Sequence, residues 1–330
     1  MPLTRQRQKI RQFCAWMILC ACLLRFCLAG GPERVRKWLT QPNTLAILTY
    51  LETGRYVRFS ASSEETLPEK RPFFRESPAP EEKRLSLEGV AIPELTYGCA
   101  LRPELRELLD KPLDWDLQGE EPRVLILHTH TTESYRKTEE PYEESSRYRT
   151  LDPDYNMVAM GVLLKNLLEE AGIRVIHDTA FHDYPSYNSS YVHARKSTEA
   201  VLKENPSVCL VLDLHRDALE TTAGQIRPRV ETEEGSCAQL MLVMGTNAAG
   251  QDFDTWQQNL SLGLKLHALL ERQTPGIMRP LQLRAQRFNQ DLSPGALIVE
   301  VGAAGNTRQE AILGVEKLAR AIIALAPGTE

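Results

Sequence analysis

Short apolar runs alternate with longer amphipathic segments from residue 123 to the C-terminus. Each run is rich in β-branched or leucine side chains and has the length typical of a buried strand. The runs lie at 124–127, 173–176, 208–214, 239–244 and 297–301. Segments with helical spacing of apolar residues lie at 155–171, 191–205, 256–271 and 308–325. Because strands and helices that alternate in this way form βαβ units, the pattern predicts an α/β fold, with a mostly parallel sheet and helices on both faces.

The first 31 residues have a different pattern. Four basic residues precede an apolar run from Phe13 to Leu24, and Arg25 separates this run from a second apolar stretch. A basic flank before an apolar segment is typical of a membrane anchor whose N-terminus stays in the cytoplasm. The small residues Ala29 and Gly30 leave a cleaved signal peptide as the alternative. We therefore expect a single-pass protein of the cell membrane, anchored through residues 1–31, with its catalytic domain outside the cytoplasm.

In the stretch from 32 to 95, residues 35–51 have weak helical character and residues 60–83 are rich in glutamate, serine, proline and arginine. Prolines at 68, 72, 78 and 80 exclude a long helix in the second half of this stretch. The composition predicts a flexible stalk between the membrane and a catalytic domain that occupies residues 96–330. The stretch at 229–237 is a polar, glutamate-rich insertion in that domain, to which the sequence assigns no role.

Metal-binding side chains follow two of the predicted strands. His128, His130 and Glu133 come directly after the run at 124–127, and His215 follows the run at 208–214. The carboxyl ends of parallel strands meet at one edge of a sheet, where clefts form in α/β proteins. Histidine nitrogen and carboxylate oxygen are ligands of catalytic zinc. We therefore predict a zinc site made by His130, Glu133 and His215, with His128 as a neighbouring group and as the alternative to His130.

Glu300 lies inside the apolar run at 297–301. A carboxylate there is costly to bury without a partner. Next to a metal and its water, burial would raise its pKa into the range useful for a general base. The alternative is a structural ion pair with Arg216. Asp213 and Asp217 flank His215 and are candidates to orient its ring, although solvated or capping roles explain them equally well.

The loop that precedes the Glu300 strand, Arg287 to Pro294, carries amide and hydroxyl groups. Asn289 and Ser293 are candidates to bind a polar polymeric substrate, although an ordinary polar loop explains them equally well. The segment from His182 to Asn188 is a further candidate to line the same cleft.

Charge and cysteine content exclude some classes of protein. The formal net charge of −5 gives no reason to expect a nucleic-acid partner. Four of the seven cysteines lie in the first 31 residues, and the remaining three are too sparse for a disulfide framework.

A third candidate function is a serine hydrolase that uses Ser134 or Ser293 as its nucleophile. The sequence contains no G-x-S-x-G motif to support it.

Several of these segments, in this order, resemble one family. They are HTHTTESY at 128–135, HDTAFHDYPSYNSSY at 177–191, DLHRDA at 213–218, MGTN at 244–247 and FNQDLSPGALIVEVG at 288–302. Together they resemble the stage II sporulation protein P family, the peptidoglycan hydrolases of endospore-forming bacteria. The resemblance covers about Arg123 to Leu325, and the N-terminal anchor and stalk agree with it.

This resemblance implies an amidase-like α/β domain, related to the zinc N-acetylmuramoyl-L-alanine amidases. It implies amidase and endopeptidase activity on peptidoglycan during engulfment, in a membrane complex with the stage II sporulation proteins D and M. His130, Glu133 and His215 would bind zinc, and Glu300 would be the catalytic carboxylate. In the wider amidase pattern the glutamate ligand opens a helix, near the position of Asn156 in this chain. The alternative function is a catalytically inactive scaffold that binds the cell wall with the same fold.

Overall fold

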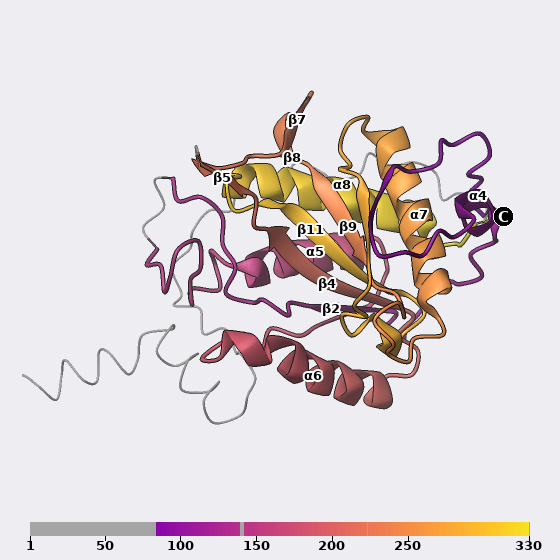
Figure 1. Cartoon of the computed structure of the whole chain (residues 1–330), viewed down its shortest axis with the longest axis horizontal. Helices are drawn as coiled ribbons and strands as arrows, with labels where there is room; N and C mark the ends of the chain where they lie inside the picture. Colours follow the sequence, from indigo (N-terminus) through magenta and orange to yellow (C-terminus); the bar gives the residue numbers. More distant parts are fainter. Residues whose placement is uncertain (1–83, 139–141, 223, 330) are drawn as a thin grey trace, which may run out of the picture. The chain divides into compact units, whose positions relative to one another are not determined.

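A seven-stranded sheet forms the centre of the computed structural model, which describes residues 84–138, 142–222 and 224–329 (Figure 1). Neighbouring strands are parallel except for β9 and β11, which are antiparallel. The α/β fold and the mostly parallel sheet are thus confirmed. In spatial order the strands are β1 (Leu95–Gly98), β10 (Leu281–Arg284), β9 (Leu240–Met244), β11 (Ala296–Ala303), β4 (Leu210–Asp217), β2 (Val124–Leu127) and β3 (Val175–His177).

Helices cover both faces of this sheet, as predicted. The main core contains residues of α5 (Met157–Glu170), α7 (Trp256–Gln273) and α8 (Arg308–Leu325), and a second core contains residues of α6 (Ser190–Glu204). Figure 1 shows α6 and α8 on opposite sides of β2 and β4. In β2, Val124 and Ile126 belong to the main core, whereas Leu125 and Leu127 pack in the core that contains Ala194 of α6. Burial of both faces explains why this strand is a continuous apolar run.

The helix ends follow from local side-chain chemistry. Thr307 accepts a hydrogen bond from the Glu310 amide, and the Glu310 carboxylate accepts one from the Thr307 amide, which forms a capping box at the start of α8. The Asn156 side chain accepts from the Val158 amide at 2.9 Å and so caps α5. Gly172, with a φ of 84°, follows the end of α5 in the left-handed conformation that favours glycine.

Two strands of the sheet and two hairpins were not predicted. The strands β1 and β10 each have four residues and pair with one another next to β9. The hairpins comprise β5 (Glu220–Thr221) with β6 (Gly224–Gln225), and β7 (Arg229–Thr232) with β8 (Gly235–Ala238). The β7–β8 hairpin accounts for the glutamate-rich insertion. A short helix, α4 (Leu105–Asp110), and two 3-10 turns, η1 (Tyr187–Ser189) and η2 (Gln290–Leu292), complete the described elements.

The end of the expected stalk contacts the domain. The Leu85 amide donates a hydrogen bond to the Gly328 carbonyl, Val90 is buried, and Leu95 begins β1. The predicted anchor at 1–31 and the stalk up to residue 83 lie outside the described residues. Within the part of the chain that the structure describes, none of the helices has the length and apolar character needed to span a membrane.

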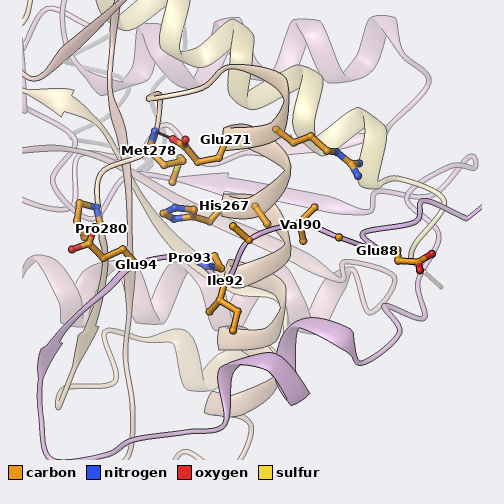
Figure 2. A pocket seen from close by; sticks show the side chains of 13 residues that line it. Glu88, Val90, Ile92, Pro93, Glu94, His267, Glu271, Met278 and Pro280 are labelled. Carbon is orange, nitrogen blue, oxygen red and sulfur yellow. Dashed lines mark hydrogen bonds between the residues drawn. The ribbon is translucent and has the colours of Figure 1, made fainter.

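A cavity of about 540 Å³ lies between α7 and the segment that leads into β1 (Figure 2). Its lining includes residues 88–94, the buried His267 of α7 and the segment before β10, with Met278 and Pro280. None of the side chains predicted to form the metal site lines this cavity.

Candidate functional site

The strands β2, β4 and β11 carry the predicted catalytic side chains to one edge of the sheet. These three strands are parallel neighbours, and Leu127 at the end of β2 is opposite Asp213 of β4. Glu300 of β11 is directly opposite His215 of β4. The turn after β2 therefore places His130 and Glu133 beside His215 and Glu300. The sequence predicted this convergence from the carboxyl ends of separate strands.

His130 and His215 are in direct ring contact. Their ring centroids are 5.3 Å apart and the planes are nearly perpendicular, at 87°. His130 Nδ1 is buried and has no hydrogen-bond partner among the described residues. Burial lowers the pKa of His130 to about 4, so this imidazole is neutral at pH 7. A neutral ring with a free nitrogen is the form in which histidine binds a metal.

His215 lies between two carboxylates. Its Nδ1 is 3.6 Å from Glu133 Oε2. Its Nε2 is 3.0 Å from Asp213 Oδ1, but the angles of this second contact do not meet those of a hydrogen bond. Burial by itself would lower the pKa of His215, but the two carboxylates outweigh it and hold the pKa well above the ordinary value. Asp213 is fixed in turn by the amide and hydroxyl of Thr129, at 2.7 and 2.6 Å. Asp213 is thus placed to orient His215.

Glu133 is held by two arginines. Its Oε1 is 3.3 Å from Arg149 Nη2 and 3.4 Å from Arg216 Nη1, and its Oε2 accepts the Arg216 amide at 3.2 Å. Burial alone would raise the pKa of Glu133, but Arg216 and His215 keep it well below the ordinary value. The carboxylate is therefore ionised. Oε1 contacts both guanidinium groups, and Oε2 accepts the Arg216 amide and lies near His215.

Glu300 contrasts with Glu133, because its Oε2 is buried without a partner among the described residues. Burial raises the pKa of Glu300 to about 8, although the neighbouring His215 acts in the opposite direction. Arg216, its alternative partner in the sequence analysis, is engaged by Glu133 and by the carbonyls of Ser134 and Tyr148. Glu300 is therefore a carboxyl group that the described structure leaves uncommitted.

His128 uses both of its ring nitrogens inside the fold. Its Nδ1 donates to the Leu214 carbonyl at 3.2 Å, and its Nε2 is 2.8 Å from Nε2 of His177. Since a carbonyl only accepts, Nδ1 carries the proton and Nε2 accepts from His177. His128 is fully buried, and burial lowers its pKa to about 4. Between the two histidines of the motif, this geometry favours His130 as the ligand.

The remaining candidates lie further from the cluster. Asp217 pairs with Arg279 at 2.7 Å and does not bind His215. Asn289 donates to the backbone carbonyl of Tyr191 at 2.8 Å, which holds its loop against α6. Ser293 accepts the Gly295 amide at 3.2 Å in the turn before β11, seven residues from Glu300 along the chain. Ser293 is thus a turn residue at the opposite end of the strand from the site.

Two of the three predicted ligands have atoms at a spacing that fits a zinc ion. Two ligand atoms around tetrahedral zinc are about 3.4 Å apart, because each bond is about 2.0–2.1 Å long. His215 Nδ1 and Glu133 Oε2 face each other at a similar spacing, and the unpartnered Nδ1 of His130 is on the adjacent ring. As placed, the described residues contain no group of three histidine, cysteine or acidic side chains already arranged as a metal site. Asn156 serves as a helix cap and is not part of the cluster.

Comparison with known proteins places the chain in a family. The model of the family described as stage II sporulation protein P matches residues 57–323. The chain belongs to the stage II sporulation protein P family. It is similar to the stage II sporulation protein P of Bacillus subtilis (strain 168), with 26% identity over 211 residues, or 58% of this chain and 48% of that protein. The chain thus spans about half the length of the curated relative it matches.

Two solved structures of amidases are also similar, at low sequence identity. The N-acetylmuramoyl-L-alanine amidase AmiC2 of Nostoc punctiforme is 11% identical, with a TM-score of 0.38, and the match covers 62% of this chain and 97% of that one. The CwlD amidase of Clostridioides difficile, solved in complex with the GerS lipoprotein, is 16% identical, with a TM-score of 0.36. That match covers 61% of this chain and 94% of the amidase.

The site in this member of the sporulation protein P family includes residues beyond the predicted ligands and Glu300. Arg149 comes from the polar loop after the His/Glu turn and bonds to both Glu133 and Asp183. Tyr187 stacks on His130 with ring centroids 4.5 Å apart, and Tyr191 approaches the same ring edge-on. Asp183 and Tyr187 lie in the segment from His182 to Asn188, which the sequence analysis named as a candidate to line the cleft. Arg149 has no sequence signal beyond the composition of its loop.

Proposed function

We propose that this chain is a zinc-dependent peptidoglycan hydrolase, an N-acetylmuramoyl-L-alanine amidase and endopeptidase that acts in engulfment during sporulation. Its membership of the stage II sporulation protein P family supports a role in sporulation. The observation that carries the enzymatic proposal is the cluster at the sheet edge. Two contacting imidazoles, His130 and His215, lie beside the uncommitted carboxyl group of Glu300.

His130, Glu133 and His215 would hold the zinc ion. When bound, zinc supplies Lewis-acid polarisation of the scissile carbonyl and lowers the pKa of a water molecule. Asp213 orients His215 through the contact at Nε2, and Arg149 and Arg216 fix the Glu133 carboxylate. Carboxylate partners of this kind set the ring orientation and basicity of histidine ligands.

Glu300 would act first as the general base and then as the general acid of the reaction. It accepts a proton from the attacking water and delivers it to the nitrogen of the leaving amine as the C–N bond breaks. Its position opposite His215 on the neighbouring strand places it beside the ligands, and its Oε2 has no competing hydrogen bond among the described residues. A general base needs this combination of proximity and an unoccupied oxygen.

The same proposal includes the location of the enzyme in the cell and its partners. Residues 1–31 would anchor the chain in the cell membrane, with the catalytic domain on the extracytoplasmic side. Tethering near the wall raises the effective concentration of the polymeric substrate. The stage II sporulation proteins D and M would be its partners, as the resemblance implies. The net charge of −5 supports no nucleic-acid partner.

The decisive experiment is digestion of purified peptidoglycan by the full-length chain. Mass spectrometry of the products should show free stem peptides and separated cross-links, and prior chelation of the metal should abolish both. Re-addition of zinc should restore activity. A chain that binds peptidoglycan but releases no products, with or without zinc, would instead support the inactive wall-binding scaffold.

A further inference from the structure

Tyr191 projects from the first turn of α6 toward the catalytic cluster. Its ring is perpendicular to that of His130, with centroids 5.7 Å apart, and it contacts Phe288 at 5.8 Å. The Asn289 side chain donates to the Tyr191 carbonyl at 2.8 Å and fixes the backbone. Figure 1 shows α6 alongside β2, the strand whose end carries His130. The phenol ring is thus in contact with His130 and Phe288, and its backbone is held by Asn289.

The Tyr191 ring contacts the site through His130, and its hydroxyl group lies near charged side chains. His215, Asp213, Glu300 and Glu133 all lie close enough to act on it electrostatically. No hydrogen bond found within the described residues uses this hydroxyl, and the bond from Asn289 ends on the backbone carbonyl. Tyr191 is half-buried, so its hydroxyl is not sealed inside the protein, whereas the buried Tyr135 hydroxyl already donates to the Val301 carbonyl at 2.9 Å.

We propose that Tyr191 is a catalytic residue whose hydroxyl donates a hydrogen bond to the oxyanion formed during hydrolysis of the amide. This inference rests on the proposed function and deepens it. A phenol with an ordinary pKa of about 10 is a neutral donor at neutral pH. Its O–H bonds to no described residue, so its proton is available beside the His130 ring.

The step balances without any further reactant. The oxygen of water bonds to the carbonyl carbon, and the π electrons of the carbonyl move onto its oxygen. Glu300 takes the water proton, while the Tyr191 O–H donates a hydrogen bond to the new oxyanion and keeps its own proton. When the carbonyl re-forms, the C–N bond breaks and Glu300 gives its proton to the amine nitrogen. The contribution of Tyr191 is greatest in the transition state, where charge develops.

A purely packing role predicts something different. If Tyr191 only supports His130 and Phe288, the aromatic ring is sufficient and the hydroxyl is dispensable. Tyr191→Phe keeps both ring contacts and removes only the oxygen. Since no described residue bonds to that oxygen, the thermal midpoint of unfolding should stay within about 2 °C of the wild-type value.

The test compares Tyr191→Phe with wild type as full-length chains on soluble peptidoglycan fragments. We expect kcat to fall on the order of 10- to 100-fold with little change in KM, because one oxyanion donor is lost. The bound zinc content should be unchanged. Tyr97→Phe, on the distant strand β1, is the matched control and should leave kcat unaltered. A phosphinate analogue of the scissile amide, which mimics the tetrahedral centre, should lose affinity for Tyr191→Phe by a similar factor.

The outcomes separate the two proposals. An active wild-type enzyme whose Tyr191→Phe variant retains kcat and phosphinate affinity overturns the role of Tyr191 alone. A variant with raised KM and unchanged kcat also overturns it, because such a hydroxyl would serve ground-state binding. A wild-type chain that cleaves no peptidoglycan overturns the proposed function, and with it the role of Tyr191.

Discussion

His215 and Glu300 are directly opposite each other on the parallel strands β4 and β11. The parallel register fixes their separation through backbone hydrogen bonds, not through flexible loops. The proposed metal ligand and the proposed proton acceptor are thus pre-organised on rigid strands, which favours catalysis by positioned groups. The relationship also makes the roles of these residues separable by mutation.

Replacement of Glu300 by glutamine should separate chemistry from metal binding. The amide has nearly the same shape but cannot act as a base, so kcat should fall on the order of 10²- to 10⁴-fold while zinc remains bound. Metal analysis and turnover on the same preparation test this. Glu94→Gln, at an exposed site before β1, is the control. Wild-type turnover by Glu300→Gln would show that another group carries the proton.

His130 and His128 should respond differently to substitution. His130→Ala removes a nitrogen that has no partner in the fold, so zinc should be lost with little loss of stability. His128→Ala removes two buried hydrogen bonds and leaves a cavity, which should cost about 2–4 kcal/mol of unfolding free energy while zinc still binds. Urea denaturation and metal analysis of both variants give the comparison. The reverse pattern would make His128 the ligand.

Gly161 of α5 should not tolerate alanine. A Cβ at this position would lie 2.3 Å from His177 Nε2 and 2.6 Å from His128 Nε2, so the helix or the histidine pair would have to shift. Overpacking of this kind costs about 1–3 kcal/mol, which outweighs the gain of about 1 kcal/mol in helix propensity. The control is Gly263→Ala in α7, where the nearest atom is the flexible Met244 Sδ at 3.0 Å. Equal midpoints of urea unfolding for the two variants would refute this explanation.

Lys265 of α7 should give the domain a distinctive pH dependence. Its Nζ donates to the carbonyls of Leu108 and Leu109, and burial lowers its pKa from 10.5 to about 8. Between these values the unfolded chain binds more protons than the folded one, so this group makes stability rise with pH. Relative to Lys265→Met, wild type should gain at most about 3 kcal/mol from pH 7 to pH 10. Urea unfolding at several pH values measures it, and parallel curves for the two proteins would exclude the effect.

The sequence was sufficient for the elements that are buried on both faces or have strong caps. β2 was predicted at its observed bounds because all four of its residues are apolar, and α8 because its apolar residues follow a helical period from Arg308 to Leu325. The approach of His130 to His215 followed from the rule that parallel strands end at one edge. These inferences needed only local composition and the direction of the strands.

Other features depended on tertiary contacts that leave no local pattern. β10 has only two apolar residues in four and becomes a strand because β1 and β9 pair with it. Arg149 reaches Glu133 from a loop whose sequence resembles any polar surface segment. Ser293 could be excluded from the site only when the length and direction of β11 were known, since the strand carries Glu300 away from that turn.

The reversal of direction between β11 and β9 determines where this architecture can change. Because β9 runs opposite to β4, the excursion through the β5–β6 and β7–β8 hairpins leaves the sheet after Asp217 and returns at Leu240 along one and the same rim. That rim also carries His215 and Glu300. Insertions or deletions between these two points would therefore change the surroundings of His215 and Glu300 while the strand register stays the same.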